Sequence, residues 1–289
     1  MIETTSVFEF GGDLPIKRLG YGAMRLTGQP GNFGPYSNWQ GGMRLLRHAV
    51  DLGINFIDTA EAYGPGFNED IIAEALHPYR EDLVIATKGG INKPAPNQIQ
   101  ADASPESLRR GVENSLRRLN LEQIDLYQLH RPDPKVPFAE SIGALAELQQ
   151  AGKIRHLGVS NVSLEQLQEA QSIATIASVQ NRYSLLDRTH AKMLKYCTDN
   201  NIAFIAYGPL AAHPLKAGSP LMETSGVLYQ IAIAHQASPT QIALAWLLQQ
   251  APNLLLIPGT TTISHLEDNF ASATITLTPT ELLQLNNLV

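Results

Sequence analysis

The sequence predicts an α/β protein that folds as a single closed (β/α)8 barrel, a TIM barrel, with an N-terminal β-hairpin and a C-terminal helix. Eight short apolar runs alternate with amphipathic stretches along the 289 residues, which is the pattern of parallel strands connected by helices. No Pro- or Ser-rich linker and no evident repeat divides the chain. Residues 1–289 are therefore predicted to form one domain.

Local patterns predict each element in turn. Alternation around Gly11-Gly12-Asp13 predicts the hairpin, over residues 7–17. Ser104 and Pro105 suit the N-cap and the first position of a helix, and Gly152 ends another. The strands are predicted at 18–21, 55–58, 83–88, 124–129, 154–159, 176–180, 202–207 and 254–257. The helices are predicted at 44–52, 69–76, 105–119, 138–150, 163–170, 189–200 and 239–250, with a last helix from about residue 278.

Composition argues against several classes of function. The chain has 21 Lys and Arg against 27 Asp and Glu, a net charge of −6, and no basic stripe that would bind nucleic acid. No apolar run reaches the roughly 18 residues of a membrane span, and residues 1–10 do not resemble a signal peptide. The single cysteine, Cys197, fits a reducing compartment, so a cytoplasmic location is expected. The eight histidines lack metal-ligand spacing, and no metal is expected.

Three of the predicted strands end in an ionisable side chain. These are Asp58, Lys88 and His130, and Tyr63 lies on the loop that follows Asp58. The carboxyl ends of barrel strands are where such folds carry their chemistry, so the four side chains are expected to meet. A neighbouring ammonium would favour the phenolate and make Tyr63 a better proton donor. Asp58 would keep Lys88 charged, and His130 would polarise a carbonyl.

Each of the four residues also has a purely structural interpretation. Asp58 could cap a helical turn, Tyr63 could be an ordinary loop aromatic, and His130 could be a satisfied histidine at a strand end. Lys88 is the hardest to explain by packing, because a lysine at the end of a buried strand gains nothing from burial. Their joint occurrence favours a proton-transfer site. None of them is a hydride source, so a redox reaction would need a bound cofactor.

At these residues the chain resembles the aldo-keto reductases over almost its whole length. The stretch from Asp58 to Tyr63, Thr87-Lys88 and Gln128-Leu129-His130 are similar to the motifs that carry that family's Asp, Tyr, Lys and His tetrad. The resemblance implies hydride transfer from a nicotinamide nucleotide to a small aldehyde or ketone, with Tyr63 as the general acid. It also implies a monomer.

The cofactor motifs of that family have counterparts here as well. The resemblance assigns the carboxamide to Ser160, Asn161 and Gln180, and the stacked aromatic to Tyr207. It assigns the pyrophosphate and adenosine-phosphate sites to Gly208, Pro209, Leu210, Pro258, Gly259, Thr260, His265, Asp268 and Asn269. Many relatives have Lys at position 259 and Arg at position 265, where this chain has Gly and His. NADPH is the expected cofactor, with NADH as the alternative.

A closer resemblance is to the pyridoxal reductase-like branch of the family. It rests on the stretch 18–26, on Phe33-Gly34-Pro35 and on the stretch 243–249, and it makes pyridoxal the most specific substrate expectation. The loops 27–41 and 208–226 are longer than ordinary connections, which is typical of functional loops. Met24 and Trp39 are expected to line the substrate mouth.

Two other functions remain open at this level. One is a cofactor-sensing regulatory subunit with little turnover, like the potassium-channel β subunits that share this fold. The other is an aldolase that uses Lys88 as a Schiff-base nucleophile. The pairing with Asp58 disfavours the aldolase, because it would keep the lysine protonated.

Overall fold

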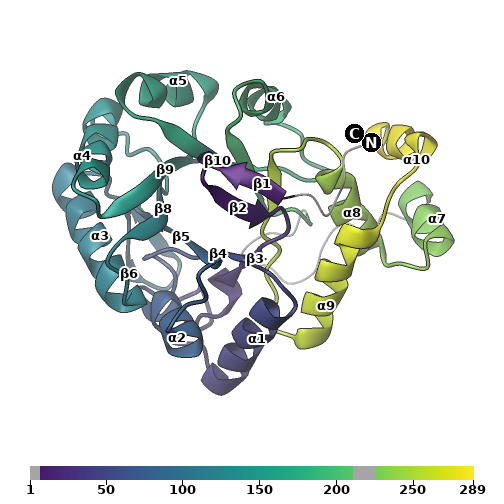
Figure 1. The fold of residues 1–289 in the computed structure, drawn as a ribbon, viewed down its shortest axis with the longest axis horizontal. Helices are drawn as coiled ribbons and strands as arrows, with labels where there is room; N and C mark the ends of the chain where they lie inside the picture. Colours follow the sequence, from purple (N-terminus) through teal and green to yellow (C-terminus); the bar gives the residue numbers. More distant parts are fainter. Residues whose placement is uncertain (1–6, 211–225) are drawn as a thin grey trace.

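A computed structural model describes residues 7–210 and 226–289. Its centre is a barrel of eight parallel strands surrounded by helices (Figure 1). In chain order the strands are β3 (Tyr21–Gly22), β4 (Phe56–Asp58), β5 (Val84–Gly89), β8 (Ile124–Leu129), β9 (Ile154–Ser160), β10 (Ile176–Arg182), β11 (Ala203–Tyr207) and β12 (Leu254–Leu256). Each strand pairs with the next in this order. The predicted fold class is therefore confirmed.

The barrel closes between its first and last strands, just before β3. Leu19 forms a parallel bridge with Leu256. Gly20 N donates to Leu256 O at 2.8 Å, and Leu256 N donates to Arg18 O at 2.8 Å. The buried Arg18 guanidinium also donates to two backbone carbonyls, of Leu248 and Ala251. The predicted strand at 18–21 thus contributes mainly this closing bridge.

The helices cover the outside of the barrel (Figure 1). They are α1 (Trp39–Asp51), α2 (Phe67–Leu76), α3 (Pro105–Leu119), α4 (Phe138–Gln150), α5 (Leu164–Ile173), α6 (Ala191–Asp199), α7 (Val227–Ala234), α8 (Pro239–Leu248), α9 (Ile263–Ala271) and α10 (Pro279–Asn286). Ser104 caps α3 as predicted, its side chain accepting from Ser107 N. Gly152 follows α4 with a φ of +75°, a conformation that glycine adopts without strain.

Helix α1 begins five residues before the predicted start at 44, and α7 was not predicted. Asn38 caps α1 by accepting from Gly41 N at 3.1 Å. The glycines inside this first turn are poor helix formers, and for this reason the predicted start of α1 lay too far along the chain. The structure explains one of them, because a Cβ on Gly42 would lie 2.8 Å from Ile71 Cδ1 of α2.

Two hairpins complete the fold. The predicted one joins β1 (Val7–Phe10) to β2 (Leu14–Lys17) in antiparallel pairing, and its buried Phe10 and Ile16 pack against side chains inside the barrel. The other joins β6 (Ile91–Ala95) to β7 (Gln98–Ala101) after β5, and no pattern in the sequence predicted it. In the described part of the chain, no helix combines the length and the apolar character needed to span a membrane.

Candidate active site

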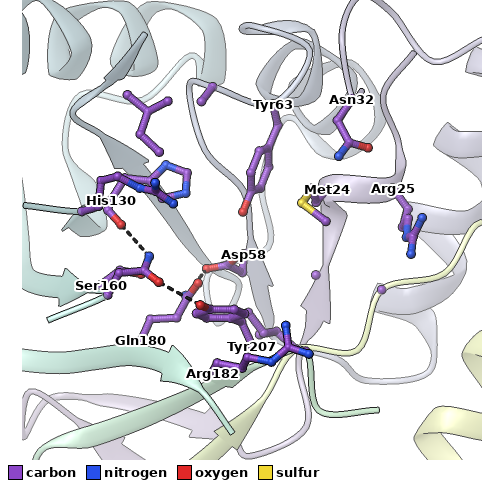
Figure 2. A pocket seen from close by; sticks show the side chains of 18 of the residues that line it. Met24, Arg25, Asn32, Asp58, Tyr63, His130, Ser160, Gln180, Arg182 and Tyr207 are labelled. Atoms are coloured by element: carbon purple, nitrogen blue, oxygen red, sulfur yellow. Dashed lines mark hydrogen bonds between the residues drawn. The ribbon is translucent and has the colours of Figure 1, made fainter. Parts of the chain in front are cut away.

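A cavity of about 320 Å³ opens at the carboxyl ends of the barrel strands. Its walls come from strand ends, from the loops that follow them and from the β6–β7 hairpin. Three of the four predicted catalytic side chains, Asp58, Tyr63 and His130, line it. Figure 2 shows the Tyr63 hydroxyl pointing toward Asp58, with His130 to one side. Lys88 lies beneath them and is fully buried.

Lys88 connects the acid to the phenol. Its Nζ donates to Asp58 Oδ1 at 2.6 Å and to Thr59 O at 2.8 Å. The same Nζ lies 3.4 Å from Tyr63 Oη. Asp58 comes from the end of β4 and Lys88 from β5, and these strands are paired neighbours. The predicted convergence at one barrel end is thus present in the structure.

The charge state of Lys88 follows from these contacts. Burial alone would lower the pKa of this ammonium, but Asp58 and Tyr63 together outweigh burial and raise the pKa above its ordinary value. Lys88 is therefore protonated at neutral pH. A protonated amine has no lone pair for attack on a carbonyl, so this arrangement disfavours the Schiff-base chemistry of an aldolase.

Tyr63 differs from the sequence expectation in one respect. Burial raises the pKa of its hydroxyl above the ordinary value, and Lys88 only partly opposes this effect. The free protein does not therefore hold an acidified phenol, as the spacing of charges had predicted. Tyr63 is protonated across the neutral pH range. The Lys88 ammonium would stabilise the phenolate that forms when Tyr63 donates its proton.

His130 lies beside Tyr63, with the two rings edge to face and their centroids 5.9 Å apart. Burial, with the charges of Lys88, Arg131 and Lys93, lowers the pKa of His130 well below its ordinary value. The imidazole is therefore neutral. Its buried Nδ1 has no hydrogen-bond partner within residues 7–210 and 226–289. A neutral imidazole offers one N–H donor for a carbonyl oxygen without competing as an acid.

The polar residues assigned to a carboxamide lie together on the adjoining wall. Ser160, Asn161, Gln180 and Tyr207 all line the cavity. Asn161 Nδ2 donates to His130 O and to Ser160 Oγ, while Tyr207 Oη donates to Asn161 Oδ1. Gln180 Nε2 donates to Asp58 Oδ2 at 2.7 Å, which ties this wall to the catalytic floor.

The segments assigned to the cofactor phosphates divide into two groups. Gly208, Pro209, Leu210, Pro258 and Gly259 line the cavity. Thr260 lies outside it before α9, and His265, Asp268 and Asn269 lie outside it within α9, where His265 and Asp268 are exposed. No side chain caps the N-terminus of α9, which leaves backbone N–H groups that suit an anion. Residues 211–225 of the loop predicted to be functional lie outside the described ranges.

The predicted substrate residues have different positions. Met24 lines the cavity. Trp39 does not; its Nε1 donates to Glu74 Oε2 at 2.8 Å on the outer surface between α1 and α2. The expectation for Trp39 failed because it treated the residue as part of a loop, whereas the structure places it at the first position of α1.

Several lining residues were not predicted. Asn32, Ile91, Lys93, Ile99, Arg131 and Arg182 all border the cavity. The position of Arg131 next to His130 was a signal that could have been used. Lys93 and the two isoleucines lie on the unpredicted β6–β7 hairpin, so only the fold reveals them. Asn32 comes from the 27–41 loop, which therefore contributes to the cavity as expected.

Residues 18–289 match the model of the Aldo/keto reductase family. The chain is 40% identical to the pyridoxine 4-dehydrogenase of Escherichia coli over 283 residues, which cover 96% of each protein. It is 42% identical to an uncharacterized oxidoreductase of Schizosaccharomyces pombe, over 92% of this chain and 84% of that protein. A crystal structure of an aldo-keto reductase from Klebsiella pneumoniae in complex with NADPH superposes with a TM-score of 0.83, at 30% identity, over 98% of this chain and 95% of that one.

Proposed function

Because the chain belongs to the aldo/keto reductase family, we propose that it reduces a small aldehyde or ketone to the alcohol with NADPH, and that Tyr63 is the general acid. The observation that carries this proposal is the chain of contacts from Asp58 through Lys88 to Tyr63 at the floor of the cavity. The protein is an NAD(P)H-dependent oxidoreductase. The roles of individual residues follow from their chemistry.

The cavity wall fits a nicotinamide carboxamide. Ser160 Oγ accepts from Asn161 but its own O–H has no acceptor among the described residues, and Gln180 Oε1 has no donor there. A carboxamide has one acceptor and one NH₂ donor, so it is complementary to this pair. Tyr207 adds an aromatic face on the same wall. The chemistry that NADPH supplies when bound is a hydride for the carbonyl carbon.

The proton for the carbonyl oxygen comes from Tyr63. Its O–H bond breaks as the bond to the carbonyl oxygen forms, and the phenolate that remains lies 3.4 Å from the Lys88 ammonium. That contact stabilises the phenolate and so lowers the barrier to proton donation. His130 is neutral and holds the carbonyl oxygen by a hydrogen bond. Solvent then returns a proton to Tyr63 through the open mouth.

Pyridoxal is the specific substrate we propose. The support is the 40% identity to a protein named pyridoxine 4-dehydrogenase, over 96% of this chain. NADPH is proposed over NADH because the Klebsiella relative was crystallised with it, and because the uncapped N-terminus of α9 offers N–H groups for a phosphate. Gly259 and His265 supply no permanent charge there, so discrimination between the two cofactors is expected to be weak.

The test is the oxidation of NADPH, followed by its absorbance, with pyridoxal and a panel of aldehydes. Tyr63→Phe should lower kcat by about 10² to 10⁴, the usual contribution of a general acid, while NADPH affinity by fluorescence titration stays nearly unchanged. Tyr229→Phe, which alters an exposed tyrosine on α7, is the matched control. An unchanged rate in Tyr63→Phe would exclude its role as the acid. Tight NADPH binding without turnover of any aldehyde would instead favour a regulatory subunit.

A further inference from the structure

The cavity has more positive than negative charge, and the cations divide into two pairs. Within residues 7–210 and 226–289 its lining includes Arg25, Lys93, Arg131 and Arg182 but a single carboxylate, Asp58. That carboxylate is already paired with Lys88.

Two of the four cations belong to the cofactor wall. Arg182 Nε donates to Asp187 Oδ2 at 3.1 Å. A Cβ on Gly259 would lie 3.6 Å from Arg25 Cγ, so Arg25 lies against the 258–259 segment. The other two, Lys93 and Arg131, are near the catalytic side chains.

Lys93 is held beside Tyr63. Its Nζ donates to Asn32 O at 2.8 Å, and the same oxygen accepts from Gly64 N at 3.2 Å. The ammonium therefore lies close to the peptide that follows Tyr63, at the edge of the cavity. Only 8% of Lys93 is exposed. An ammonium has three N–H donors, and across the described ranges only this one contact and no ion pair engages it.

Arg131 is the second cation near the catalytic residues. It directly follows His130, lines the cavity and is exposed, and no ion pair or hydrogen bond holds its side chain in the part of the chain that the structure describes. Its charge and that of Lys93 both depress the pKa of His130. Both cations are therefore within electrostatic reach of the point where a carbonyl would be held.

We propose that Lys93 and Arg131 recognise an anionic group of the substrate, a carboxylate or a phosphate, carried close to the reacting carbonyl. This inference rests on the proposed reductase function and names the substrate class of that site. Pyridoxal carries neither group, so the inference places its 5′-phosphate, or a carboxylated aldehyde, ahead of pyridoxal itself as the substrate. Keeping a buried ammonium without a counter-ion is costly, and an anionic substrate supplies the missing charge. The cofactor is the other possible source of negative charge. Arg25 lies against the 258–259 segment assigned to its phosphates, and the NADPH affinity of the variants separates the two sources.

The test uses pairs of aldehydes that differ in one anionic group. For a carboxylate the pair is 4-carboxybenzaldehyde and its neutral methyl ester; for a phosphate it is pyridoxal 5′-phosphate and pyridoxal. The measured quantity is the ratio of kcat/KM for the charged member to that for the reference member, in wild type, Lys93→Met, Arg131→Met and Lys135→Met. Lys135 is an exposed lysine in the same loop as Arg131 and does not line the cavity, so its variant is the matched control.

We expect wild type and Lys135→Met to prefer the charged member of at least one pair, and the pair shows which anion is recognised. The preference should fall at least about tenfold in Lys93→Met, and in Arg131→Met as well. Added salt should reduce this preference. The part of the preference that depends on the exposed Arg131 should fall more steeply with salt than the part that depends on the buried Lys93. Far-UV circular dichroism shows whether Lys93→Met is folded, and Arg131→Met tests the proposal on a rim residue that folding does not require.

Three outcomes would overturn the inference. Wild type could show no preference within either pair, the variants could keep the wild-type preference, or they could instead lose NADPH affinity, which would assign the cations to the cofactor. If none of the aldehydes is reduced, the reductase proposal fails by itself. Calorimetric titration with 4-(hydroxymethyl)benzoate then still tests the proposal that Lys93 and Arg131 bind an anion, because this anion should bind to wild type and not to Lys93→Met.

Discussion

Replacement of Lys88 by Met tests most directly whether the Lys88 ammonium assists proton donation by Tyr63. The change removes the ammonium that lies 2.6 Å from Asp58 Oδ1 and 3.4 Å from Tyr63 Oη, and it keeps a side chain of similar length. Two effects are expected. The phenolate formed during proton donation loses its stabilising charge, and the Asp58 carboxylate is left buried without its cation.

The size of the rate effect follows from the distance. Two unit charges 3.4 Å apart interact by about 5 kcal/mol at an effective dielectric constant of about 20. If half of the phenolate charge has developed in the transition state, the loss is about 2.5 kcal/mol, which lowers kcat about a hundredfold. The unpaired carboxylate should lower the free energy of unfolding by about 3–5 kcal/mol.

The assay separates these two effects with a second variant. Lys88→Met combined with Asp58→Asn removes both charges, so urea unfolding should show most of the stability restored, while kcat stays low. Lys192→Met, at an exposed position of α6, is the control for loss of a lysine. The electrostatic account is refuted if the folded Lys88→Met enzyme turns over within about threefold of wild type, which is under 1 kcal/mol.

Three further predictions concern other residues of the site and its surroundings. The pKa of His130 in the folded protein lies well below its ordinary 6.5, so below about pH 6.5 the unfolded chain binds a proton that the folded protein does not. The free energy of unfolding should therefore fall as the pH drops below about 6.5. Urea titrations at pH 7 and pH 5 should show a weaker pH dependence in His130→Gln. Ser160→Ala should raise the Kd for NADPH about fivefold, the value of one hydrogen bond, and fluorescence titration would count against the carboxamide assignment if the Kd stayed the same. Trp39→Phe should leave the substrate KM unchanged, because Trp39 bonds Glu74 outside the cavity, and a raised KM in steady-state assays would show that this placement is wrong.

Most of the barrel could be predicted because its signals are local. A buried strand is apolar over its whole length, and a capped helix start such as Ser104-Pro105 shows itself within a few residues. The β6–β7 hairpin and the start of α1 escaped prediction for the opposite reason. The hairpin mixes polar residues with isolated isoleucines. Gly41 and Gly42 are typical of a loop, and only the packing of α2 against Gly42 explains a glycine inside this helix.

The sequence by itself determined which chemical groups this protein brings to its site, since an ionisable side chain at the end of a buried parallel strand must emerge at the catalytic end of the barrel. Only the tertiary structure decided how those groups behave. The pKa of Tyr63 is raised rather than lowered, and Lys93 becomes a cation with one hydrogen bond to the described residues and little exposure to solvent. The physical reason is that burial and charge pairing depend on atoms from distant parts of the chain, which no local pattern records.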